Sequence, residues 1–111
     1  MTAPEFGLVE FPADDAGRAR AFWGGLLEAE LAERTDEQGA GWQAGGMGVH
    51  ERGAGPGDRV SLPYLSVDDL PAKLEQVAAL GGTVIHPGER WAVCRDSEGN
   101  PFALAARPPS P

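Results

Sequence analysis

A strand pattern is followed directly by the signals of a helix start in one stretch of the sequence, Val60-Ser61-Leu62-Pro63-Tyr64-Leu65-Ser66-Val67-Asp68-Asp69-Leu70-Pro71. Apolar side chains alternate along 60–67, with Leu62 and Tyr64 on one face, and this alternation predicts a β-strand. The carboxylates that follow can accept hydrogen bonds from the free N–H groups of a helix start. Pro71 is tolerated in a first helical turn because its missing N–H would be unpaired there. The stretch therefore predicts a strand that leads directly into a helix.

The same order of signals occurs in the first half of the chain. A constant shift places Asp14-Asp15 on Asp68-Asp69 and Leu8 on Leu62. Strands are predicted over 6–11, 29–34, 41–44 and 47–51, and again over 60–67, 83–86, 91–95 and 101–106. We therefore expect one domain, residues 1–111, built from module one at about 4–52, a linker at 52–58 and module two at about 59–107.

Composition narrows the class of protein. The 111 residues carry a formal net charge of −8, and an acidic surface repels both nucleic acid and anionic membranes. No apolar run approaches the roughly 20 residues of a spanning helix, and the first residues lack the pattern of a signal peptide. Cys94 is the only cysteine, so no disulfide forms within one chain. These features predict a cytoplasmic protein without a nucleic-acid or membrane partner.

Four short runs of the sequence resemble motifs of a known family. The run Asp15-Ala16-Gly17-Arg18-Ala19-Arg20-Ala21-Phe22-Trp23 is similar to the family's first helix. The runs Val67-Asp68-Asp69-Leu70, Leu80-Gly81-Gly82 and Asp96-Ser97-Glu98-Gly99-Asn100-Pro101-Phe102 are similar to its second half. In their order and spacing they resemble the vicinal oxygen chelate superfamily, which includes glyoxalase I, extradiol dioxygenases and bleomycin-resistance proteins. One departure is Glu28, which stands where a helix-ending glycine is common.

The resemblance implies an α+β fold of two βαβββ modules, whose curved mixed sheets surround a cup, and a homodimer. It also implies four metal-ligand positions in the family's metal enzymes, and these fall on Leu8, Leu62 and Ala103 and near Gly48. None of these side chains supplies a nitrogen or oxygen ligand, so we expect no metal and no cofactor. A displaced metal site with Glu10, His50 and a third group is a weaker alternative.

The residues expected to line the cup are Leu8, Glu10, Trp42, Gly48, His50, Leu62, Tyr64, Trp91 and Ala103. For several of them an ordinary structural role is the competing interpretation. His50 would then be a surface histidine near the linker, Glu10 a solvated strand-end carboxylate, and the two tryptophans part of the core.

The leading hypothesis for function is a metal-free small-molecule binding protein of the bleomycin-resistance type, with an apolar or planar ligand such as an antibiotic. The enzyme alternative is a cofactor-free isomerase, lyase or epimerase that uses Glu10 or His50 as general base. A third possibility is an accessory domain whose cup is filled by its own side chains. The sequence alone favours the first.

Overall fold

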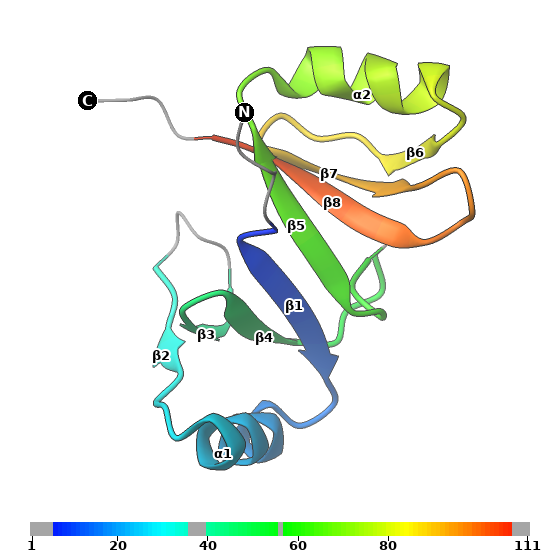
Figure 1. Cartoon of the computed structure of the whole chain (residues 1–111). Helices are drawn as coiled ribbons and strands as arrows, with labels where there is room; N and C mark the ends of the chain where they lie inside the picture. The colour runs from blue at the N-terminus through cyan, green and yellow to red at the C-terminus, as the bar shows by residue number, and fades with distance from the viewer. Residues whose placement is uncertain (1–5, 36–39, 56, 108–111) are drawn as a thin grey trace. The chain divides into compact units, whose positions relative to one another are not determined.

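The computed structural model describes residues 6–35, 40–55 and 57–107. Its contacts divide the chain into two compact units. The N-terminal unit spans residues 8–61, and the C-terminal unit spans residues 62–107 together with Phe6 and Gly7. Each unit contains a strand, a helix and three further strands (Figure 1). The predicted α+β class is confirmed.

In the N-terminal unit, β1 (Leu8–Ala13), α1 (Ala16–Leu27), β2 (Ala32–Glu33), β3 (Trp42–Ala44) and β4 (Met47–Glu51) follow in chain order. Their sheet order is β2-β3-β4-β1, with β1 parallel to β4 and the other pairs antiparallel. The first strand of the unit therefore lies beside its last strand, and the sheet is mixed.

The C-terminal unit repeats this topology with β5 (Leu62–Val67), α2 (Leu70–Ala79), β6 (Thr83–His86), β7 (Trp91–Arg95) and β8 (Pro101–Ala106). Its sheet order is β5-β8-β7-β6, with β5 parallel to β8. The last three strands have the predicted bounds, and the repeat inferred from the acidic pairs is present in the fold.

Both helices begin where the acidic pairs predict. The side chain of Asp15 accepts a hydrogen bond of 2.9 Å from the backbone N–H of Arg18. Asp69 accepts one of 3.1 Å from that of Ala72. Each carboxylate satisfies one of the N–H groups that a helix start leaves unpaired.

Each helix covers one face of its own sheet. In the N-terminal unit, Ala19 and Trp23 of α1 pack on a core that contains Leu31 and Val49. In the C-terminal unit, α2 packs on a core of Val67, Leu70, Cys94 and Leu104. The described residues include no helix long and apolar enough to cross a membrane.

Three sequence expectations need correction. The strand predicted over 29–34 is reduced to Ala32–Glu33, and the first strand continues through Pro12 to Ala13. It continues because the backbone carbonyl of Ala13 still accepts a 2.8 Å hydrogen bond from the N–H of Arg52. The spacing of Ala19, Phe22, Trp23 and Leu26 predicts one apolar face on α1. This face is only partly buried, since Phe22 and Leu26 are 60% and 63% exposed.

Candidate ligand-binding site

The face of the N-terminal sheet that points away from α1 carries a row of aligned residues. Glu10 of β1 is the register partner of Gly48 in β4, and Gly48 is the partner of Gln43 in β3. Because side chains alternate along a strand, His50 lies on the same face as Gly48, while Val49 points into the α1 core. Three strands thus bring polar groups to one surface.

Glu10 is buried, with 4% of its surface exposed, and it is paired on both carboxylate oxygens. The guanidinium of Arg34, which follows β2, donates from Nη1 to Oε1 at 3.0 Å and from Nη2 to Oε2. The Arg34 side chain is itself only 7% exposed. A fork of this kind compensates a buried carboxylate with two directed bonds.

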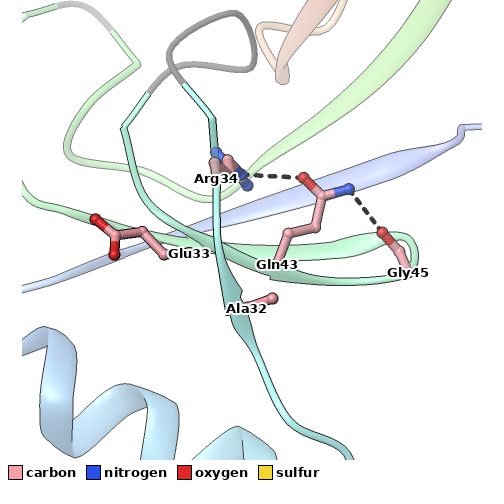
Figure 2. A pocket seen from close by; sticks show the side chains of 5 residues that line it. All are labelled: Ala32, Glu33, Arg34, Gln43 and Gly45. Atoms are coloured by element: carbon pink, nitrogen blue, oxygen red, sulfur yellow. Dashed lines mark hydrogen bonds between the residues drawn. The ribbon is translucent and has the colours of Figure 1, made fainter.

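Gln43 holds the guanidinium from its other side. Its Oε1 accepts a 3.0 Å hydrogen bond from Nε of Arg34, and its Nε2 donates to the carbonyl of Gly45 at 2.8 Å (Figure 2). Arg34 is therefore fixed at both ends of its planar group.

Gly48 leaves the space that this ion pair occupies. A Cβ at position 48 would overlap Nη2 of Arg34 and Oε2 of Glu10, which are ends of side chains already locked together. The neighbouring ion pair is therefore the reason why this position requires a glycine.

His50 completes the group. Its Nδ1 lies 2.9 Å from Oε1 of Glu10. Its Nε2 is a buried side-chain atom without a hydrogen-bond partner in the part of the chain that the structure describes. The four side chains Glu10, Arg34, Gln43 and His50 are called the Glu10 cluster below.

The contacts shift two pKa values in opposite directions. Burial opposes ionisation of Glu10, but hydrogen bonds from His50 and Arg34 outweigh it, so the pKa of Glu10 lies below its ordinary value. The hydrogen bond to Glu10 raises the pKa of His50 despite burial, and the backbone and charge of Asp58 act in the same direction. The cluster thus favours a charged carboxylate beside a charged imidazole.

A pocket of about 280 Å³ borders the cluster, lined by Ala32, Glu33, Arg34, Gln43 and Gly45. Figure 2 shows Glu33 extending away from Arg34 and Gln43. The polar groups that the Glu10 cluster contributes to this pocket are therefore the guanidinium of Arg34 and the side-chain amide of Gln43.

The other predicted residues are placed by register. Leu8 shares the Glu10 face by alternation. Trp42 pairs with Val49 and packs in the α1 core, where the guanidinium of Arg20 lies 4.9 Å from its ring centroid. Trp42 therefore does not join the Glu10 cluster.

In the C-terminal unit, the predicted residues gather on the sheet face opposite α2. Tyr64 is the register partner of Ala103, and alternation puts Leu62 and Trp91 on the same face. Leu62 and Ala103 are buried, and Trp91 is 42% exposed. This face is largely apolar, in contrast to the face that carries the Glu10 cluster.

Arg34 and Gln43 were not among the predicted site residues. Arg34 stands outside any strand, 24 positions from Glu10, so no local period indicates that the two meet. The signal that could have indicated this contact is Glu10 itself. A carboxylate on a strand needs a cationic partner if the strand is buried, and module one contains few arginines.

The metal positions implied by the family do not fit a metal ion. Leu8, Leu62 and Ala103 have no donor atom, and the space beside Gly48 is filled by the guanidinium of Arg34. A fixed positive charge there repels a divalent cation. In this chain Glu10 binds an arginine side chain instead.

The comparisons with known proteins agree with the fold. A family model described as "Glyoxalase-like domain" matches residues 8–105. No curated protein matches the sequence.

Solved structures similar to this chain share its fold at low identity. An NAD-dependent benzaldehyde dehydrogenase from Legionella pneumophila is 14% identical, with a TM-score of 0.68 over 90% of this chain and 97% of that one. An uncharacterized protein from Methanosarcina mazei is 16% identical, with a TM-score of 0.67 over 99% and 98%. A hypothetical protein from Bacillus halodurans C-125 is 13% identical, with a TM-score of 0.66 over 99% of both chains.

Proposed function

Because this chain belongs to the glyoxalase-like domain family, within the vicinal oxygen chelate superfamily, we propose that it is a metal-free small-molecule binding protein. Its polar anchor is the Glu10 cluster. In the N-terminal unit, Leu8 lies on the same sheet face as this anchor. In the C-terminal unit, a largely apolar face carries Leu62, Tyr64, Trp91 and Ala103. Each of these faces, taken by itself, offers a surface for a planar ligand such as an antibiotic. A cytoplasmic homodimer is part of the same proposal.

The observation that carries this proposal is the buried Nε2 of His50, which has no hydrogen-bond partner among residues 6–35, 40–55 and 57–107. Burying an ion pair and a charged ring is costly, and an apolar group of the same size serves stability as well or better. A polar atom that stays buried without a partner adds a further cost. Both costs are explained if the cluster serves a bound molecule.

A thermal-shift screen against planar antibiotics and other planar small molecules tests the proposal. A ligand that binds the native state raises the melting temperature. The shift should be lost in His50→Gln and kept in the matched control Glu75→Gln, whose side chain is on the exposed surface of α2. If no compound in the screen raises the melting temperature, the binding proposal is wrong.

The second candidate is a cofactor-free isomerase, lyase or epimerase, and the structure favours His50 over Glu10 as its base. The Glu10 carboxylate is occupied by Arg34 and His50. Because that carboxylate can only accept, it keeps a proton on Nδ1. His50 would therefore act as a base through Nε2 in the singly protonated form of the ring, at pH values above its titration.

Deuterium exchange discriminates the two candidates. A base that removes a proton from carbon catalyses exchange of that position in D₂O, which proton NMR of each stabilising compound detects. An enzyme shows exchange that is lost in His50→Gln, whereas a binding protein shows none with any compound that binds.

A further inference from the structure

The ring of His50 has two nitrogens in different situations. Nδ1 lies 2.9 Å from a carboxylate oxygen that accepts but cannot donate, so Nδ1 carries a proton. Nε2 is buried and has no partner among the described residues, although the side chain as a whole is 16% exposed. A ligand atom that reaches Nε2 gains a hydrogen bond without replacing one to water.

The charges around the ring determine whether a ligand atom at Nε2 must accept or donate a hydrogen bond. The negative charge of Glu10 also interacts with the guanidinium of Arg34, which donates a hydrogen bond to each of the two carboxylate oxygens. Asp58 also acts on the ring, through its backbone and through its negative charge, and its Oδ2 accepts a 2.9 Å hydrogen bond from the N–H of Gly55. These groups together favour the doubly protonated ring, in which Nε2 is a donor.

We infer that the ligand is an organic acid, and that its ionised oxygen accepts a hydrogen bond from Nε2 of His50. This rests on the proposed function and names the ligand class for the same site. A charge-assisted N–H···O bond is roughly twice as strong as a neutral one. In this arrangement the ligand oxygen contacts His50, and Glu10 is a positioning residue that holds the ring at Nδ1. Arg34 acts one step further away, because it holds the carboxylate of Glu10.

Matched acids and amides test the inference. The probes are benzoate and 2-naphthoate, each compared with its neutral amide by calorimetry. At pH values below the titration of His50, each carboxylate should bind at least about tenfold more tightly than its amide. This preference should disappear above that titration, and it should be absent in His50→Gln.

Nitrogen NMR spectra of the histidine rings report whether the ligand carboxylate contacts Nε2 of His50 directly. Binding of the carboxylate should shift the Nε2 resonance of His50 and raise the pH at which this ring titrates. His86, the second of the two histidines, lies in the other unit and serves as the internal control.

The outcomes separate the two proposals. Amides that bind as well as acids, or an acid preference that does not change with pH, overturn the organic-acid inference. The inference is also overturned if only neutral compounds from the thermal-shift screen bind, and the binding proposal then stands. If neither the probes nor any compound of the screen binds, both are wrong.

Discussion

At the scale of single residues, the position of Glu10 changes the interpretation of the site. Its carboxylate appears in the sequence as a candidate base at the end of a strand. In the structure it is buried and holds two cationic side chains. A carboxylate with a lowered pKa and two partners is a poor proton acceptor. His50 is therefore the better candidate for a group that transfers a proton.

Replacement of Gly48 tests how tightly the cluster is packed. We expect Gly48→Ala to lower the free energy of unfolding by about 2 kcal/mol or more, because the new Cβ displaces a locked ion pair. Urea unfolding measures this. Gly25→Ala in α1 is the control, since no atom lies within 4 Å of its added Cβ. It should be neutral or stabilise by about 0.5–1 kcal/mol. Equal effects of the two substitutions would contradict the packing described.

The two shifted pKa values predict a pH dependence with opposite signs. The raised pKa of His50 contributes stability that is complete below its ordinary value of 6.5 and is lost as pH rises through the folded value. The lowered pKa of Glu10 contributes stability above its ordinary value of 4.5, lost as pH falls through the folded value.

The free energy of unfolding should therefore be highest between these two titrations. Denaturant unfolding at a series of pH values measures it, and His50→Gln should remove the decline on the alkaline side. An unchanged alkaline decline in that variant would mean that another group is responsible.

At the scale of elements, helix ends account for much of the regularity of the chain. Asp15 and Asp69 cap the two helices through the same kind of side-chain bond. The end of α1 is less favourable, because Glu28 has φ 53° and ψ 47°, in the left-handed region that suits glycine. This residue is the departure from the family pattern noted in the sequence.

We expect Glu28→Gly to stabilise the protein by about 0.5–1 kcal/mol, because a left-handed conformation costs glycine little. Thermal unfolding followed by circular dichroism is sufficient to measure the change. Glu30→Gly, at an exposed position without positive φ, is the matched control and should bring no gain. A loss of stability in Glu28→Gly would show that the carboxylate has a role that outweighs the strain.

At the scale of the whole molecule, charge is the dominant property. The formal net charge of −8 on 111 residues implies repulsion between surface carboxylates. The Glu10 cluster is largely protected from this effect, because its two paired side chains are 5% and 7% exposed. Dissolved ions therefore act mainly on the surface.

Added salt should raise the melting temperature modestly between about 10 mM and about 150 mM NaCl, where the Debye length falls from about 30 Å to about 8 Å. Differential scanning calorimetry measures the effect. A Glu75→Lys, Glu89→Lys variant carries less negative charge at exposed positions and should respond less. A melting temperature that falls with salt would mean that attractive surface pairs outweigh the repulsion.

Local signals in the sequence determined the elements, the caps and the internal repeat. Alternation, helical spacing and side chains that bond their own backbone act between near neighbours, so the strands over 83–86, 91–95 and 101–106 could be predicted to the residue. The pairing of Asp96 with Asn100 in the turn between the last two strands is local in the same way.

Only the tertiary structure decided what Glu10 and His50 do. Arg34 lies 24 positions from Glu10 in the chain, and His50 lies 40 positions away. Strand register brings His50 beside Glu10, and the absence of a side chain at Gly48 admits the guanidinium. Such contacts depend on how distant segments align in a sheet, and the period of a single strand carries no information about its partner.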